Sequence, residues 1–510
     1  MSRLARGLAL GMLAALLASS VGEANEQPGP RSAEPDGYES FHSYGGDMHV
    51  HSGSPAGAYN QTLSSWNPAC NDCPSVWCTR MYSFARQAGY DWVVSTNHEG
   101  SLPSYYRPGD PLGGLAMTPE ILAWWKGAGP NYSNPAHRQD VYPTHPAGFP
   151  LYDGSGGHTD DQIASLASCA DAATENGHFV AFFGIEYTAA PASEMGCRTE
   201  AVGCGGHKTV IFPRARNRAL GERACTGASG ASVYDDQCRT LGQLYRQVAA
   251  MGGVVNIAHP NFGPNPGLAP FQATAKGDNG GIDPNVVVGV EMQEFSPELT
   301  PGLESTYPGK ARRIAGLNIG GFLARGYRVH PVFGSDWHFE PTATSWPAGF
   351  SAGATECWAR ALTKADLLDA MRAHRCYFAR DGIQVRLTIE HAIMGSSLAS
   401  DAVDPKQGLH IRLSAQGKSA IIGTSQWFLM RGKVRRPIVA PAPLSLASTV
   451  ANCNAGGGAA ASERCVKDVR VSIPGATTAA DYEGFYYVIL RRGAMEVAVT
   501  APVWVDPPAR

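Results

Sequence analysis

A strong charge of either sign is missing from this 510-residue chain. Its 41 Lys and Arg residues stand against 44 Asp and Glu residues, which leaves a formal net charge of −3. Proteins that bind nucleic acids usually carry a basic surface, so the near-neutral balance argues against such a partner. Charged residues make up 17% of the chain and hydrophobic residues 44%, which is typical of a folded globular protein.

Long apolar segments are also scarce, and no run has the roughly 20 apolar residues of a membrane-spanning helix, so no membrane partner is expected. The beginning of the chain has a shorter pattern. Arg3 and Arg6 precede an apolar run over 8–17, and small residues lead up to Ala24. This pattern is typical of a secretory signal peptide that is cleaved after Ala24. We therefore predict a signal peptide over 1–24, a linker over 25–40, and a secreted or periplasmic protein.

Cysteine, in contrast, is present in an even number, with 12 residues. In an exported protein an even count first indicates disulfide bonds. The short closures Cys197–Cys204, Cys225–Cys238 and Cys453–Cys465 are plausible, although the sequence does not determine the connectivity. The group Cys70, Cys73 and Cys78 leaves a zinc or iron–sulfur corner open as an alternative.

The central part of the chain, over 41–385, alternates short apolar runs with segments of helical periodicity. Helix-patterned segments include one around Met81 to Ala88, and others over 159–175, 241–251, 310–325 and 363–374. Buried strands are expected over 91–95, 178–183, 254–258, 286–292 and 329–333, with a further short strand over 207–212. Repeated alternation of this kind predicts a parallel α/β sheet, either open or closed into a barrel. Long irregular inserts over 101–158 and 188–239 interrupt it.

The end of the chain, over 386–510, has a different pattern. Apolar and polar residues alternate at period two over 385–389, 409–413, 469–473, 485–490 and 497–505, with Gly- and Pro-rich turns between them. This pattern predicts a small antiparallel β-sandwich.

The segment Asp47-Met-His49-Val-His51 carries the first candidate for chemistry. Alternate residues of a strand point to one face, so His49 and His51 would face one metal ion, and Asp47 would hold an imidazole in the required tautomer. Neutral imidazoles are common ligands of zinc, manganese and iron.

Other predicted strand ends carry similar residues. They are His98, which follows Asn97, and then Glu186, His207, His259, Asp336 and His338. In parallel α/β folds the active site lies at the carboxyl ends of the strands, so these side chains are expected to meet at one edge. We also note Lys208 as a candidate contact to an anionic substrate.

Taken in order, these motifs resemble the PHP (polymerase and histidinol phosphatase) superfamily. The resemblance covers about 41–385 and implies a distorted (β/α)7 barrel with two or three divalent ions, Zn, Mn or Fe, at its carboxyl rim. By position, His49, His51, Glu186 and Asp336 would bind one metal. Glu186 would bridge to a second ion held by His207 and His259, while His98 and His338 would serve a third. A metal-bridging hydroxide held by Glu186 and Asp336 would be the nucleophile.

The chain departs from the family at two places. Asn97 stands where the family usually has Asp, and is expected to act as a second-shell acceptor. Ala56 and Gly57 stand where many members carry an Asp or His ligand, which puts the third metal in question.

A protein nucleophile is not evident, because the cysteines are expected to be paired in disulfides. The leading hypothesis is therefore an exported metal-dependent phosphoesterase acting on small organic phosphates. The pattern after residue 362 also resembles the exported carbaryl-hydrolase-type (CehA/McbA) branch of the superfamily, which implies a carbamate or carboxylic ester as the alternative substrate. A non-catalytic metal-containing binding module is the alternative of another class.

Overall fold

The computed structural model describes a set of ranges between residues 37 and 508. The described ranges are 37–50, 74–96, 160–189, 206–213, 225–226, 232–233, 241–258, 286–292, 319–324, 326–335, 353–422, 425–434, 442–444, 452–454, 462–493 and 495–508. The predicted signal peptide lies outside them. Pro35–Arg510 forms one compact unit, and the domain boundary predicted between residues 385 and 386 stays a prediction.

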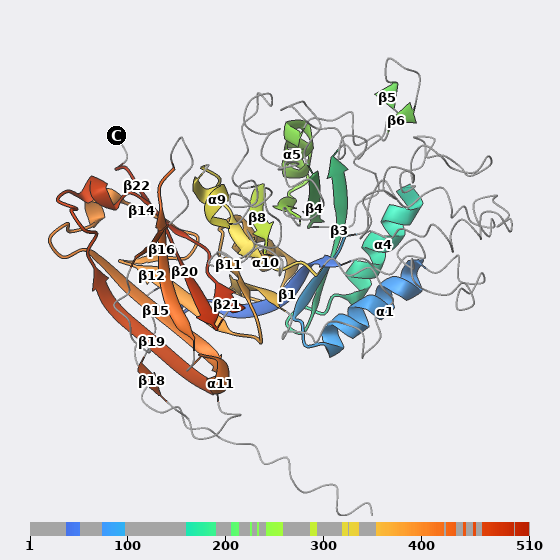
Figure 1. Ribbon diagram of the computed structural model, residues 1–510. Coiled ribbons are helices and arrows are strands. Elements are labelled where there is room, and N and C mark those ends of the chain that lie inside the picture. The colour runs from blue at the N-terminus through green and yellow to red at the C-terminus, as the bar shows by residue number, and fades with distance from the viewer. Residues whose placement is uncertain are drawn as a thin grey trace, which may run out of the picture. The chain divides into compact units, whose positions relative to one another are not determined.

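A large mixed sheet contains the strands expected from the buried apolar runs (Figure 1). Its first part has the order β1-β2-β3-β4-β7-β8-β9. The bounds are β1 (His42–Val50), β2 (Trp92–Ser95), β3 (Val180–Ala189), β4 (Gly206–Phe212), β7 (Val254–Ile257), β8 (Val287–Glu291) and β9 (His330–Val332). The Met48 amide donates to the Phe333 carbonyl at 3.2 Å, which joins β1 to the residues that follow β9.

Strand β4 does not follow the expected parallel direction. Strands β1, β2 and β3 are parallel, as are β7, β8 and β9, but β4 is antiparallel to both of its neighbours. It pairs with β3 so that His207 lies opposite Thr188. The amino end of β4 therefore lies at the same edge as the carboxyl end of β3, which is where the metal hypothesis requires His207.

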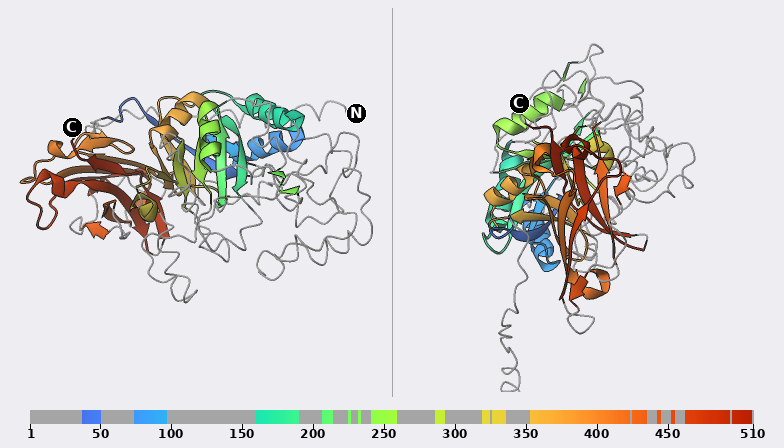
Figure 2. Two further views of the ribbon diagram at one scale, coloured as in Figure 1. Left: turned by 90° about the horizontal axis from the view of Figure 1, so that it is seen from above. Right: turned by 90° about the vertical axis from the view of Figure 1, so that its left-hand side faces the viewer.

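Helices cover one face of this sheet. They are α1 (Pro74–Gln87), α4 (Asp160–Ala173), α5 (Leu241–Ala250) and the short α9 (Ile319–Ala324). Residues of these helices share a core with alternate strand residues such as Val93, Ala181 and Val255. The left view of Figure 2 shows α1 and α4, in blue and teal, side by side, as their packing requires. Of the helix expected over 310–325, the described part is α9.

Helix α10 (Lys364–Arg372) packs on the opposite face of the sheet, together with Trp92, Val180 and Ile211. Thr363 caps it at the amino end, because its side chain accepts a hydrogen bond from the Asp366 amide. The helix ends at Arg372, with Ala373 as its C-cap, and His374 adopts a positive φ of 51°. It therefore stops before His374, the last residue expected from its pattern.

The large sheet continues into the C-terminal part of the chain. Strand β1 pairs antiparallel with β10 (Ala354–Ala359), which pairs with β11 (Cys376–Ala379), and the sheet then runs through β21, β20, β22 and β14. These last strands are β21 (Met495–Val499), β20 (Gly484–Arg492), β22 (Val503–Asp506) and β14 (Ser397–Ala399). Strands β16 (Gln426–Gly432) and β17 (Ala442–Leu444) extend it from β20.

A second sheet has the order β13-β12-β15-β19-β18 and is antiparallel throughout. Its strands are β13 (Ala392–Ile393), β12 (Gln384–Ile389), β15 (Leu409–Lys418), β19 (Ser462–Val471) and β18 (Asn452–Asn454). Residues of both sheets, including Leu387, Ile411 and Val488, form one buried core. A two-strand ladder of β5 (Cys225–Thr226) and β6 (Ser232–Val233) and the short helix α11 (Ser419–Ile422) complete the described elements of regular structure, apart from two 3-10 turns.

Among the described residues, no helix combines the length and the apolar composition needed to cross a membrane.

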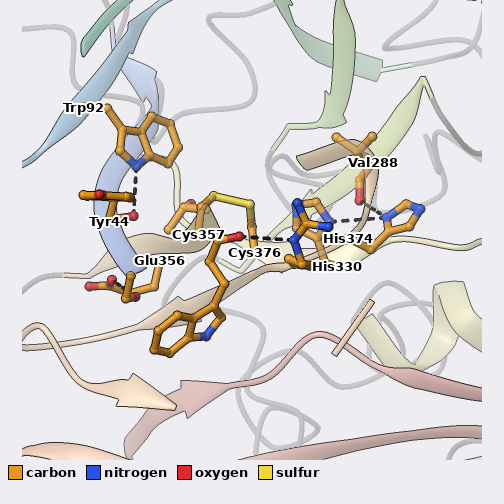
Figure 3. Close-up of a disulfide and its surroundings, with 12 residues drawn as sticks. Tyr44, Trp92, Val288, His330, Glu356, Cys357, His374 and Cys376 are labelled. Carbon is orange, nitrogen blue, oxygen red and sulfur yellow. Dashed lines mark hydrogen bonds between the residues drawn. A yellow bond between two sulfur atoms is a disulfide. The ribbon is translucent and has the colours of Figure 1, made fainter. Parts of the chain in front are cut away.

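One disulfide, Cys357–Cys376, joins β10 and β11 at directly opposite positions (Figure 3). It was not among the closures expected from the sequence. Cys465 is also disulfide-bonded, and its backbone lies opposite Cys453 in the β18–β19 ladder. That register is compatible with the expected Cys453–Cys465 closure, which stays a prediction.

We expect replacement of both Cys357 and Cys376 by Ala to lower the free energy of unfolding by about 3 kcal/mol, because the cross-link closes a loop with a sequence separation of 19. Urea denaturation without reductant measures the change. A denaturation midpoint equal to that of the wild type would contradict a stabilising role for this bond.

A buried carboxyl group, that of Glu356, lies on strand β10 next to Cys357. Glu356 is 3% exposed, and the Ser43 hydroxyl donates to its Oε2 at 2.7 Å. Burial raises the pKa of Glu356 from 4.5 to about 7, against a smaller opposing effect of the Ser43 hydrogen bond. The folded chain therefore binds this proton more tightly than the unfolded chain does.

This shift predicts that stability falls as pH rises. The contribution of Glu356 is fully present below pH 4.5 and is lost as pH rises through about 7. Glu356→Gln should remove this dependence and be more stable than the wild type at pH 8 by roughly 3 kcal/mol. Chemical denaturation at pH 4.5, 6 and 8 tests it, with the exposed Glu175→Gln as a control that should leave the slope unchanged. Parallel profiles of wild type and Glu356→Gln would refute the assignment.

Candidate active site

The imidazole of His49 lies between two buried carboxylates that come from distant strands. Its Nε2 is 3.3 Å from Glu186 Oε2 near the end of β3, and its Nδ1 is 2.8 Å from Glu291 Oε1 at the end of β8. The three residues are at most 1% exposed. The structure thus brings together two of the predicted site residues, His49 and Glu186.

Glu291 was not predicted from the sequence. It ends the apolar run over 286–292 in the same way that Glu186 ends the run over 178–183. A lone carboxylate at the end of a buried strand was therefore the available signal. Its contact with His49 Nδ1 gives it the role that we expected of Asp47, which is to hold the ring in one tautomer.

Asp47 instead binds backbone. Its Oδ1 accepts hydrogen bonds from the amides of His49 at 3.0 Å and of Ser335 at 3.1 Å. The ladder between β1 and β2 shifts register between Asp47 and Val50, so simple alternation does not place the Asp47 carboxylate beside the imidazole. Burial raises the pKa of Asp47 to about 7. The expected contact with the ring is therefore corrected: Asp47 fixes the main chain of β1 to the segment after β9.

Gly334 allows the segment after β9 to pack closely against His49 of β1 and Glu291 of β8. A Cβ atom at this position would lie 2.5 Å from Glu291 Oε1 and 2.7 Å from His49 Cβ. The Ser335 hydroxyl donates to the His49 carbonyl at 3.2 Å. The absence of a side chain at residue 334 is thus a packing requirement of the His49–Glu291 contact.

A row of polar side chains continues from Glu186 across the sheet. Thr209 lies opposite Glu186, and Asn256 lies opposite Thr209, so the three share one face. Thr209 and Asn256 are fully buried, and within the described part of the chain the Thr209 hydroxyl and both amide atoms of Asn256 have no hydrogen-bond partner. Buried polar atoms are normally paired, so water or a substrate is the expected partner here.

Lys208 lies on the other face of β4. Its backbone pairs with Ile257, which belongs to the core between sheet and helices, and its side chain is fully buried. Burial lowers the pKa of Lys208 to about 7. This placement does not favour the predicted contact between Lys208 and an anionic substrate beside Glu186.

The remaining predicted site residues cannot be placed. Outside the described residues lie His51, Asn97, His98, His259, Asp336 and His338, and only the backbone of His207 is described. Within the described ranges, no group of three or more His, Cys, Asp or Glu side chains is arranged to hold a metal ion. The metal ligands expected at these positions therefore stay a prediction.

No family model matches the chain, and no curated protein matches it. Among solved structures, it is similar to the crystal structure of a two-domain protein containing a predicted PHP-like metal-dependent phosphoesterase from Bacteroides vulgatus. The identity is 13% and the TM-score 0.33, over 92% of this chain and 97% of that one. We draw no functional conclusion from so distant a likeness.

Gly334→Ala should disturb the site, because the added methyl group must displace either Glu291 or His49. We expect a loss of about 1–3 kcal/mol in unfolding free energy and a lower content of bound divalent metal. Gly417→Ala is the matched control, since its Cβ would approach the flexible end of Ile422 at 3.0 Å. Equal stability and equal metal content in the two variants would show that a methyl group at residue 334 causes no steric conflict.

Proposed function

We propose that this chain is an exported metal-dependent hydrolase with a PHP-type active site around His49 and Glu186, and that it acts on phosphate esters of small organic molecules. The proposal rests on the contact between His49 and two carboxylates from strands far apart in the sequence.

The arrangement fits a metal ion in two respects. A neutral imidazole whose Nδ1–H donates to Glu291 presents its Nε2 lone pair to Glu186, and these two groups repel each other unless a cation or a proton lies between them. In addition, two ligand atoms that each lie about 2.0–2.2 Å from a tetrahedral ion are about 3.3–3.6 Å apart. The distance from His49 Nε2 to Glu186 Oε2 is 3.3 Å.

The competing interpretation is a doubly protonated His49 that forms ion pairs with both glutamates. Such a buried charged triad is costly to desolvate and needs no metal. Measurement of the metal content therefore distinguishes the two directly.

In the proposed site, His49, His51, Glu186 and Asp336 would hold one ion, Glu186, His207 and His259 would hold a second, and His98 and His338 would serve a third. When bound, such ions lower the pKa of water and polarise an ester oxygen, so no protein nucleophile is needed. Glu291 keeps the proton of His49 on Nδ1, and Asp47 holds the backbone of His49 against Ser335. Thr209 and Asn256 offer hydrogen bonds to a substrate or to water on the same face.

The proposal includes a barrel followed by a β-sandwich, and export from the cytoplasm. The Met48–Phe333 hydrogen bond supports closure of the seven strands from β1 to β9 into a distorted (β/α)7 barrel. The core shared by the two C-terminal sheets supports a β-sandwich. The disulfides at Cys357, Cys376, Cys169 and Cys465 support an oxidising compartment and hence export.

His49→Ala and Asp336→Ala should each abolish hydrolysis of 4-nitrophenyl phosphate and reduce the metal content of the purified protein, while the far-ultraviolet circular dichroism stays unchanged. Glu291→Ala should weaken metal binding by about 10–100-fold, because the orientation of the His49 ring is lost. The exposed His178→Ala is the matched control and should behave as the wild type does.

Full turnover by His49→Ala would remove that residue from the site. A metal-free wild-type protein would favour the ion-pair interpretation instead. Turnover of 1-naphthyl N-methylcarbamate but not of the phosphate ester would replace the proposed substrate class by carbamates while leaving the metal site in place.

A further inference from the structure

A pocket of about 400 Å³ opens beside helix α10, whose position Figure 1 shows. Its lining is dominated by charged side chains: Arg360, Asp366, Asp369, Arg372, Ala373 and Arg375. Three guanidinium groups and two carboxylates therefore face one opening.

Three of these charged groups have partners within the fold. Asp366 Oδ2 accepts a hydrogen bond from the Thr363 hydroxyl at 2.6 Å, as part of the cap of α10. Asp369 pairs with Arg372 at 3.2 Å, and Arg372 also donates to the Gly252 carbonyl. These contacts fasten the helix to the start of β7.

Arg360 and Arg375 differ from them, because within the described ranges neither forms an ion pair with a carboxylate. Arg375 is oriented all the same: its Nε donates to the Trp358 carbonyl at 3.2 Å, and its guanidinium lies 4.6 Å from the centre of the Phe41 ring. The pKa of Arg375 is lowered, first by burial and then by the charge of Arg360. Two positive charges thus share one side of the pocket.

The Cys357–Cys376 disulfide holds the segments that carry these two residues. Arg375 directly precedes Cys376, and Arg360 follows Cys357 by three positions. The amide of Trp358 also donates to the carbonyl of Arg375 at 3.0 Å. The backbone segments that carry the two arginines are therefore held next to each other by a covalently linked pair of strands.

We propose that this pocket is a binding site for a phosphate-type oxyanion, which the guanidinium groups of Arg360 and Arg375 hold together. The planar fork of a guanidinium group matches two oxygens of such an anion. The site is separate from the proposed active site, because β10 ends at Ala359 opposite His42, and His49 lies farther along β1 by roughly 20 Å.

Isothermal titration calorimetry of the full chain at low salt tests the proposal, with inorganic phosphate and with phenylphosphonate, which the proposed activity cannot hydrolyse. We expect saturable binding that Arg360→Gln and Arg375→Gln each weaken about tenfold. Asp369→Asn should strengthen it by removing a negative charge that acts on Arg375. Arg86→Gln, which removes an exposed Arg elsewhere, should leave it unchanged.

If Arg360→Gln weakens the binding of both ligands, the site accepts the phosphate group of a larger molecule, whereas weakening for phosphate alone would assign it to the free anion. Because Arg360 is exposed, Arg360→Gln gives a reading even if Arg375→Gln fails to fold. Equal affinity in Arg360→Gln and wild type, or no binding of either ligand, would overturn the proposal. Neither result would bear on metal binding at His49, so the two proposals fail independently.

Discussion

The contact between one imidazole and two buried carboxylates is the constraint on which the candidate site depends. His49, Glu186 and Glu291 come from β1, β3 and β8, which are not neighbours in the order of the sheet. Their meeting requires the part of the sheet from β1 to β9 to curve until β1 approaches β9, and the hydrogen bond between Met48 and Phe333 lies at that approach. Asp47 and Gly334 then make the approach possible, the first by binding two backbone amides and the second by leaving space.

Much of this arrangement was predictable from the sequence. The apolar runs that end at Ser95, Glu186 and Glu291 became strands because their residues are buried on both faces. Placing His49 and Glu186 together needed only the rule that carboxyl ends of parallel strands share one edge. The role of Glu291 was not predicted, since choosing the partner of an imidazole requires side-chain distances that no periodicity contains.

The direction of β4 and the position of Asp47 could not be predicted for a different reason. A short apolar run such as Val210 to Phe212 has the same pattern in a parallel and in an antiparallel strand. The register shift between Asp47 and Val50 also leaves no mark on the pattern of apolar residues, so alternation alone could not give the direction of the Asp47 side chain. The C-terminal strands were easier to predict, because period-two alternation indicates a strand whichever sheet the strand joins. That these strands continue the sheet of β1 through β10 and β11 was not predicted.

The antiparallel pairing of β4 with β3 fixes both ends of the segment that connects these two strands. Ala189 at the end of β3 pairs directly with Gly206 at the start of β4, so both ends of the connecting segment are fixed at the edge where Glu186 lies. Adding or removing residues between these two anchors alters the entropy of loop closure only slightly. We therefore expect that changes in the length of 190–205 leave the register between β3 and β4 unchanged, and with it the backbone position of Glu186.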